Sequence, residues 1–371
     1  MEFDTLCLKT EEKLALRLRS LYRRYGYSQY RMSRFEEYDL YAGNKDFLVS
    51  ENVITFTDTN GRLMALKPDV TLSIVRSSRP GAGVQKVYYS ENVYRVSART
   101  RRFGEIPQTG LECIGQVDDC CIAEVLLLAA QSLRTFSPRC VLQVSHLDLL
   151  SEAVGALGAT EETRRGILKC VGEKNLHEMT ALCEAAGAKR EDIDRLSALL
   201  RVTGTPEEAI ASLRALGFTS AAVDQLETLA EALSAAGLGD VLHIDFSVVN
   251  DMDYYNGIVF KGFVSGAPAG VLSGGQYDRL MQKLGKNARA IGFAVYLDGL
   301  ERFSAREEAY DADVVLLYDE HTSPAALCRA MRAFADNGSS VLACREAPRE
   351  LRWRRLARIS ESEVELLETD A

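Results

Sequence analysis

The chain has 371 residues, 47% of them hydrophobic and 26% charged, which is enough for one large core and one or two smaller units. Its 44 Lys and Arg against 53 Asp and Glu give a net charge of −9, which argues against a dedicated nucleic-acid binder that neutralises phosphates. The longest apolar stretches are too short for a membrane helix, and the N-terminal residues are acidic and polar where an export signal is basic and apolar, so we expect a cytoplasmic protein with no membrane span.

The first 148 residues alternate between helix and strand patterns. Leu14, Leu18 and Leu21 recur at helical spacing and predict a helix over residues 11–25, which ends at Gly26. A hairpin signal, Thr59-Asn60-Gly61, lies between two strand patterns. We therefore predict a helix over residues 118–135 and strands over residues 53–57, 62–67, 87–95, 108–115 and 140–144.

The remaining chain changes character twice. Residues 149–238 contain short helical patterns with clear start signals, such as the capping box Thr205-Pro206-Glu207-Glu208, and predict an all-helical insertion. After it we predict strands over residues 241–249 and 257–263, a helix over 277–284, and a last core helix that contains Leu297 and Leu300.

The predicted organisation has four parts. Residues 1–148 and 239–308 form one core, residues 149–238 are the helical insertion, and residues 309–371 are a small C-terminal α/β unit in strand-helix-strand order with a final strand pair. The fold class is α+β, with an antiparallel sheet flanked by helices. No G-x-G-x-x-G or P-loop pattern occurs, and the nine scattered cysteines contain no C-x-x-C pair, so we expect no metal and no cofactor.

Five segments follow one another in a recognisable order. They are Tyr25-Gly26-Tyr27 through Phe35-Glu36; Leu66-Lys67-Pro68-Asp69-Val70-Thr71; Tyr94-Arg95 through Gln108-Thr109-Gly110-Leu111-Glu112; Asp253-Tyr254-Tyr255-Asn256-Gly257; and Gly274-Gly275-Gln276-Tyr277-Asp278 with Gly292-Phe293-Ala294. In order and spacing they resemble the motifs of histidyl-tRNA synthetase and its relatives, which belong to the class II aminoacyl-tRNA synthetases. The resemblance covers about residues 11–305 and implies the class II fold.

The resemblance also implies a binding site for free L-histidine. It assigns to that pocket seven residues: Asp69, Thr71, Arg95, Gln108, Glu112, Tyr254 and Tyr255. Their chemistry agrees, because the two carboxylates, which we expect at strand ends, suit an ammonium group and the tyrosines offer ring faces and hydroxyls to an imidazole. The first motif implies a self-dimer, and the C-terminal unit is similar to a shortened anticodon-binding domain.

Two departures from the family pattern bear on function. Asn250 replaces the arginine of the synthetase R-G-L-D-Y-Y motif, and Gly299 replaces the arginine of G-[LI]-[ED]-R-L. Attack on ATP needs positioned cations, so the loss of both argues against aminoacylation. The resemblance then implies a non-catalytic relative that binds no tRNA and regulates the short-form catalytic subunit of ATP phosphoribosyltransferase in a hetero-oligomer of histidine biosynthesis. A stand-alone histidine- or RNA-binding module and a divergent synthetase-like enzyme remain alternatives.

Overall fold

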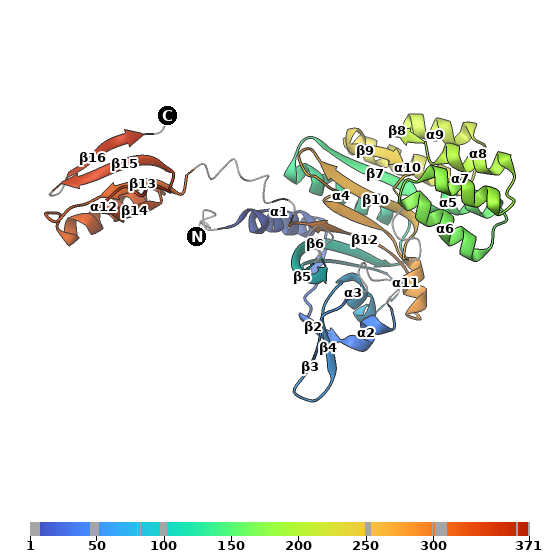
Figure 1. The fold of residues 1–371 in the computed structure, drawn as a ribbon, viewed down its shortest axis with the longest axis horizontal. Coiled ribbons are helices and arrows are strands. Elements are labelled where there is room, and N and C mark those ends of the chain that lie inside the picture. The colour runs from blue at the N-terminus through green and yellow to red at the C-terminus, as the bar shows by residue number, and fades with distance from the viewer. Residues whose placement is uncertain are drawn as a thin grey trace. The chain divides into compact units, whose positions relative to one another are not determined.

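The computed structural model describes residues 8–44, 52–79, 81, 83–96, 102–248, 254–298, 300, 310–360 and 363–369 (Figure 1). The chain divides into two compact units, Met1–Glu301 and Arg302–Ala371, and each is described by itself. The boundary predicted between residues 308 and 309 lies outside the described residues. None of the described helices is long and apolar enough to cross a membrane.

The larger unit is built on a sheet that has nine strands in the described residues. Their spatial order is β1 (Ser28–Gln29), β5 (Val84–Val96), β6 (Phe103–Gly115), β12 (Arg289–Tyr296), β11 (Leu272–Gln276), β10 (Asn256–Val264), β7 (Cys140–His146), β9 (Leu242–Asp245) and β8 (Thr203–Gly204). The pairs from β5 to β7 are antiparallel, which confirms the predicted core. The edge pairs β1–β5 and β7–β9 are parallel, which the sequence did not predict.

Two helices pack on one face of this sheet and on each other. They are α1 (Thr10–Arg24) and α4 (Asp119–Phe136), each within one residue of its predicted start and end. The apolar face of α1 buries Leu14, Leu18 and Tyr22, and the Tyr22 hydroxyl lies 3.0 Å from the Ser132 hydroxyl of α4. Asp118 begins α4 by accepting a hydrogen bond from the Cys121 N–H.

A small antiparallel sheet precedes the first strand of the predicted site. It consists of β2 (Phe35–Glu37), β4 (Leu63–Leu66) and β3 (Thr55–Thr57), followed in the chain by α3 (Thr71–Ser77) and accompanied by α2 (Tyr38–Ala42). The predicted hairpin is confirmed: Asp58 accepts from the N–H groups of Asn60 and Arg62, and Gly61 adopts a φ of +78°. The strand expected over residues 53–57 begins at Thr55.

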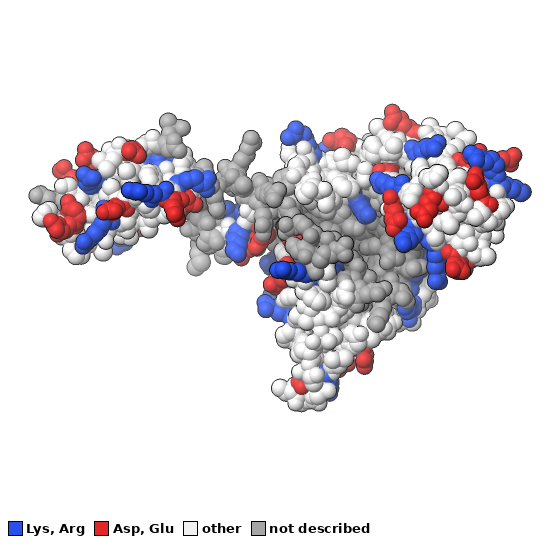
Figure 2. All heavy atoms as spheres, in the orientation of Figure 1, with Lys and Arg blue, Asp and Glu red and all other residues white. Residues whose placement is uncertain are grey.

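The segment between β7 and β9 is mainly helical. Its helices are α5 (Leu147–Ala156), α6 (Glu161–Gly172), α7 (Leu176–Ala185), α8 (Arg190–Leu199), α9 (Pro206–Ala215) and α10 (Ala221–Ala235), with a 3-10 turn η3 (Gly239–Val241). The Thr205–Glu208 capping box is present, but β8 pairs with β9, so the segment is not all-helical. Figure 2 shows basic and acidic side chains interspersed over these helices, with no dominant sign.

One helix was predicted wrongly. Leu297 and Leu300 are buried as core residues should be, but neither lies in a helix, and the Leu300 N–H donates to the Leu297 carbonyl at 3.0 Å in a turn. Two apolar residues three positions apart fit such a turn as well as a helix, so the pattern could not decide between them. The helix predicted over residues 277–284 is confirmed as α11 (Asp278–Lys283).

The smaller unit has a four-stranded sheet with one helix against it. The strand order is β14 (Val341–Cys344), β13 (Ala312–Leu317), β15 (Trp353–Ser360) and β16 (Glu363–Thr369); the first two pairs are parallel and the last is antiparallel. α12 (Pro324–Asp336) packs over Val314, Leu316 and Ile359 and joins β13 to β14. The predicted strand-helix-strand order is therefore confirmed.

Candidate functional site

A partly enclosed pocket with a cavity volume of about 70 Å³ opens at the middle of the large sheet. Its walls are Asp69, Thr71, Tyr89, Arg95, Gln108, Glu112, Tyr254, Tyr255, Ser273, Tyr277, Gly292, Phe293, Ala294 and Tyr296. All seven residues predicted for ligand binding are among them. They come from four separate segments of the chain, namely residues 69–71, β5, β6 and residues 254–255, and the pairing of β5, β6, β12, β11 and β10 forms the sheet on which these segments meet.

Glu112 lies at the centre of the pocket, inside β6 and not at its end as expected. Its side chain is buried; Oε1 accepts from the Thr71 hydroxyl at 2.7 Å and Oε2 accepts from the Tyr277 hydroxyl at 2.5 Å. Burial raises the pKa of Glu112 to about 8, while these two hydrogen bonds lower it. The pocket therefore holds a mostly protonated carboxyl near neutral pH, and a cationic ligand group would favour its ionised form.

Gly292 makes room for that carboxyl group. It lies opposite Glu112 in the β6–β12 pair, and a Cβ on Gly292 would lie 1.7 Å from Glu112 Oε2 and 2.5 Å from the Leu111 carbonyl oxygen. No side chain fits at this position without moving the carboxyl group or the strand. The absence of a side chain at Gly292 therefore allows the Glu112 side chain to lie across β12.

A second acidic group and two unsatisfied donors share the same pocket. Asp69 precedes α3 and accepts from the Leu72 N–H at 2.7 Å; burial raises its pKa, and the nearby Arg95 guanidinium lowers it. Arg95 and Gln108 are only 6% and 3% exposed, yet Arg95 Nε and Gln108 Nε2 have no hydrogen-bond partner among the described residues. Buried donors of this kind call for an acceptor, so this wall fits a carboxylate.

Tyrosine rings form the remaining wall. The ring centroids of Tyr254 and Tyr255 lie 4.4 Å apart, and those of Tyr254 and Tyr277 lie 5.8 Å apart. Acidic groups, unpaired donors and flat rings thus face one space. That combination fits a zwitterion with a planar side chain.

Several lining residues were not predicted as ligand-binding. Tyr277 and Gly292 lie in quoted motifs, so the motif itself was a usable signal for them. Tyr89, Ser273 and Tyr296 have no such signal, because they become neighbours only through strand pairing.

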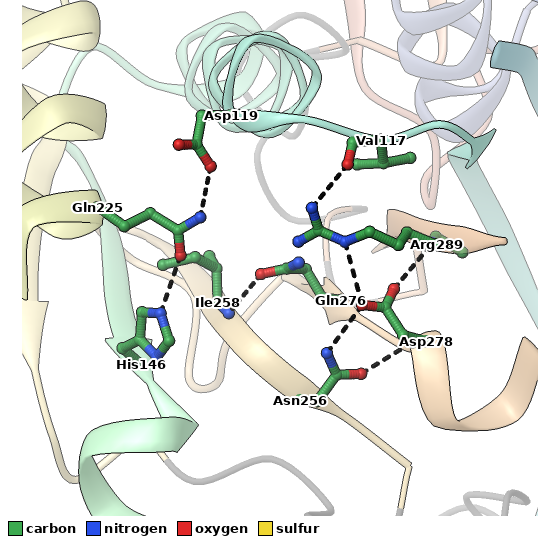
Figure 3. A network of polar contacts seen from close by, with 10 residues as sticks. Val117, Asp119, His146, Gln225, Asn256, Ile258, Gln276, Asp278 and Arg289 are labelled. Carbon is green, nitrogen blue, oxygen red and sulfur yellow. Dashed lines mark hydrogen bonds and ion pairs between the residues drawn. The ribbon is translucent and has the colours of Figure 1, made fainter. Parts of the chain in front are cut away.

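A polar network fixes the segments that present the tyrosines (Figure 3). Asp278 follows Tyr277 and accepts from Asn256 Nδ2 at 3.1 Å and from the Ala290 N–H at 2.8 Å, and its own N–H donates to Asn256 Oδ1 at 2.8 Å. Arg289 donates to Asp278 and, at 2.8 Å, to the Val117 carbonyl. The starts of β10, α11 and β12 are therefore held together just beyond the pocket.

A second part of the network joins the helical segment to the core. Gln225 of α10 lies between His146 Nε2 at 2.9 Å and Asp119 Oδ1 at 2.5 Å (Figure 3). The Asp148 N–H donates to His146 Nδ1, so Nε2 bears the proton that is donated to Gln225. Burial lowers the pKa of His146 and so keeps the ring neutral. A neutral ring can accept a hydrogen bond at Nδ1 while it donates one at Nε2, as these contacts require.

Comparison with known proteins decides the family. The sequence matches the histidyl-tRNA synthetase family over residues 7–300. The chain belongs to this family. A curated family relative named ATP phosphoribosyltransferase regulatory subunit, from Clostridium kluyveri, is 28% identical over 327 residues, which cover 84% of this chain and 84% of the relative.

Solved structures agree on the fold. One, described as an ATP phosphoribosyltransferase regulatory subunit/histidyl-tRNA synthetase from Bacillus halodurans, has a TM-score of 0.72 at 24% identity and covers 90% of this chain and 88% of that chain. A chain of the ATP phosphoribosyl transferase (HisG:HisZ) complex from Thermotoga maritima has a TM-score of 0.62 at 17% identity, covering 79% of this chain and 99% of that chain. The predicted α+β fold of the histidyl-tRNA synthetase family is confirmed.

Two positions at which this family member departs from synthetases, Asn250 and Gly299, lie outside the described residues, as does most of the loop after Arg95.

An acidic hollow lies beside the pocket in the described part of the chain. A hollow of about 440 Å³ shares Gln108 with the pocket and is lined by five carboxylates, Glu11, Glu12, Glu91, Glu105 and Asp298. Of these, Glu91 is paired with the buried Lys67 at 2.6 Å. No group of three His, Cys, Asp or Glu side chains arranged to hold a metal ion occurs among the described residues.

Proposed function

We propose that this chain is a regulatory subunit of ATP phosphoribosyltransferase, which binds the catalytic subunit and makes its activity sensitive to L-histidine. The observation that supports this most directly is the pocket, in which the buried Glu112 carboxyl group and the half-buried Asp69 carboxyl group lie with two unpaired buried donors. A family member at 28% identity over 84% of the chain has the same role in its name. The net charge of −9 also suits a protein partner better than tRNA.

The proposed ligand is free L-histidine in the pocket. Its carboxylate would accept from Arg95 Nε and Gln108 Nε2, which are otherwise unsatisfied. Its ammonium group would face the Asp69 carboxylate. Its imidazole both donates and accepts, which matches a carboxyl group whose pKa is raised to about 8, because that group can donate when protonated and accept when ionised. The tyrosine rings would then pack against the imidazole ring.

The proposal includes the absence of adenylation. ATP must approach the histidine carboxylate, and its phosphates need positioned cations. This chain lacks two family arginines, at Asn250 and Gly299, and five carboxylates line the hollow next to the pocket. Each lost electrostatic contact of this kind commonly costs several kcal/mol in the transition state. We therefore expect no histidine-dependent exchange of pyrophosphate into ATP, and exchange at a rate typical of a synthetase would contradict the non-catalytic role.

The regulatory role is tested with a purified short-form ATP phosphoribosyltransferase catalytic subunit. Mixing it with this chain should give a larger species on sizing, raise transferase activity, and make that activity sensitive to histidine. A coupling of about 1 to 3 kcal/mol corresponds to roughly 5- to 150-fold in ligand affinity. Separate elution at micromolar concentration with unchanged activity would overturn the proposal and favour a stand-alone histidine-binding module.

A matched pair of variants separates the pocket from assembly. Gln108→Leu removes the buried donor at nearly constant volume and should abolish sensitivity to histidine while the subunits still co-elute. Gln116→Leu makes the same change at an exposed position and should leave sensitivity unaltered. If Gln108→Leu retains full sensitivity, histidine binds elsewhere and the pocket assignment is wrong.

A further inference from the structure

The last strand of the smaller unit, β16, leaves one edge of its sheet open. Its inner edge pairs with β15, and its outer edge pairs with no strand of the described residues (Figure 1). In an antiparallel pair every second residue turns its N–H and C=O groups outward, so backbone donors and acceptors alternate along this outer edge. All seven residues of β16 are exposed. An edge of this kind can accept a further strand.

One face of β16 is apolar. Val364 lies opposite Ile359 and Leu366 lies opposite Ala357, so both side chains point to the face of the sheet on which α12 packs. Ile359 and Ala357 are buried there, whereas Val364 and Leu366 are 42% and 57% exposed. The apolar surface therefore continues past the part of the sheet that this unit itself covers, and a strand added at the edge would bury more of it.

The other face of β16 is acidic. It bears Glu363, Glu365 and Glu368, which lie opposite alternate residues of β15 and therefore share one face. Arg358 lies opposite Glu365, yet none of the three carboxylates has an ion pair among the described residues. Like charges oppose strand pairing, so these glutamates disfavour β16 of a second copy at this edge. The same charges attract an added strand whose side chains on that face are basic.

From the open edge, its apolar face and its acidic face together, we propose that β16 is a docking site for an extended segment of another protein in which basic and apolar side chains alternate. The added strand hydrogen-bonds along the outer edge, its apolar side chains cover Val364 and Leu366, and its basic side chains face the glutamates. β15 already has this pattern on the inner edge, because Arg358 lies on the acidic face between two apolar residues of the other face. The inference does not depend on the proposed regulatory function or on the histidine pocket.

The test uses the full chain and a fluorescein-labelled peptide of seven residues in which lysine and valine alternate. Seven residues at about 3.3 Å each match the length of β16. The anisotropy of the peptide should rise as the protein is added. A peptide of the same sequence in which every backbone nitrogen is methylated keeps its charge and side chains but has no N–H donor. It should bind about tenfold more weakly or worse, because it cannot pair with the edge.

Two substitutions test the two faces of β16. Glu363→Lys repels the basic probe, and Leu366→Thr removes exposed apolar surface while it keeps a residue that favours strands, so each should weaken binding about tenfold. Glu350→Lys and Leu351→Thr make the same changes at exposed residues of the same unit outside its strands, and they should leave binding unchanged. All four side chains are exposed, so the melting temperature should stay that of wild type.

Hydrogen exchange measured by mass spectrometry places the probe on the chain. The N–H groups of β16 should exchange more slowly when the peptide is bound, while exchange in α6 stays the same. Equal binding of the methylated peptide, equal affinity of Glu363→Lys and Glu350→Lys, or protection elsewhere than in β16 would each overturn the inference. So would slow exchange of β16 in the protein alone that becomes fast on dilution, because a second copy would then occupy the edge.

Discussion

Replacing Glu112 by glutamine should make the ligand-free protein more stable than wild type, by a margin that grows as pH rises. The amide has the shape of the carboxyl group and can keep hydrogen bonds with Thr71 and Tyr277, but it does not ionise. In wild type, the buried Glu112 carboxyl group resists ionisation in the native state, whereas the same group ionises readily in the unfolded chain. The native state of wild type therefore loses stability relative to the unfolded state as pH rises from acid to mildly alkaline. We therefore expect the stability difference between Glu112→Gln and wild type to grow with pH.

The size of the effect follows from the two pKa values. Burial raises the pKa of Glu112 from its ordinary 4.5 to about 8, so the unfolded chain releases this proton well before the native protein does. Between these values the unfolded state binds fewer protons, and the free energy of unfolding falls by up to about 1.4 kcal/mol per pH unit as pH rises. Over the whole window the loss is roughly 5 kcal/mol, present in full above about pH 8 and absent below pH 4.5.

Urea unfolding at pH 5, 6, 7 and 8 measures this difference. Far-UV circular dichroism is the suitable probe, because the single tryptophan, Trp353, belongs to the smaller unit and would report on the wrong part of the chain. Glu161→Gln, an exposed substitution in α6, is the matched control and should show no trend with pH. Parallel curves for Glu112→Gln and wild type across this range would refute the reasoning, since they would mean that Glu112 is already ionised in the native state.

Two further substitutions test the frame of the pocket. Gly292→Ala should destabilise the protein by about 1–3 kcal/mol and abolish histidine binding, because its Cβ would lie 1.7 Å from Glu112 Oε2. Gly155→Ala is the control and should be tolerated, because its Cβ would meet nothing within 4 Å. Urea unfolding measures the stability of both variants, and calorimetry measures their histidine binding. Lys286→Met should cost about 2–3 kcal/mol in urea unfolding, because Lys286 Nζ donates to the carbonyls of Val75, Arg76 and Ser78 at the end of α3; an unchanged midpoint would mean that water replaces these bonds without loss.

Local signals predicted much of this fold. The alternation and hairpin chemistry around Gly61 and the period of Leu14 and Leu18 depend on neighbours in the sequence, so β3, β4 and α1 could be predicted. The central strands β11 and β12 could not. Their glycines, such as Gly274 and Gly292, have low strand propensity and are there because neighbouring strands and the Glu112 carboxyl group leave no room for a side chain.

The candidate site was predictable as a set of residues but not as a geometry. Order and spacing of motifs singled out Asp69, Glu112 and Tyr254, and strand pairing brings them into one pocket. No sequence pattern could have predicted that Glu112 is buried, because burial depends on which distant segments cover it. The unpaired nitrogens of Arg95 and Gln108 are likewise visible only once every hydrogen-bond partner is known.

Different elements of the fold contribute the different groups of the pocket, and this suggests how a ligand could alter the conformation of the chain. The carboxyl groups come from the segment before α3 and from β6, the unpaired donors from β5 and β6, and the ring wall from the segments before β10 and α11. A zwitterion that contacts all three sets favours the arrangement in which these elements are closest. A ligand shifts an equilibrium only by its difference in affinity for two states, so a ligand that spans several independently supported elements is suited to regulation. The Asn256–Asp278–Arg289 network lies directly behind the ring wall and reaches the Val117 carbonyl before α4, so any displacement of the tyrosines must be accommodated there first.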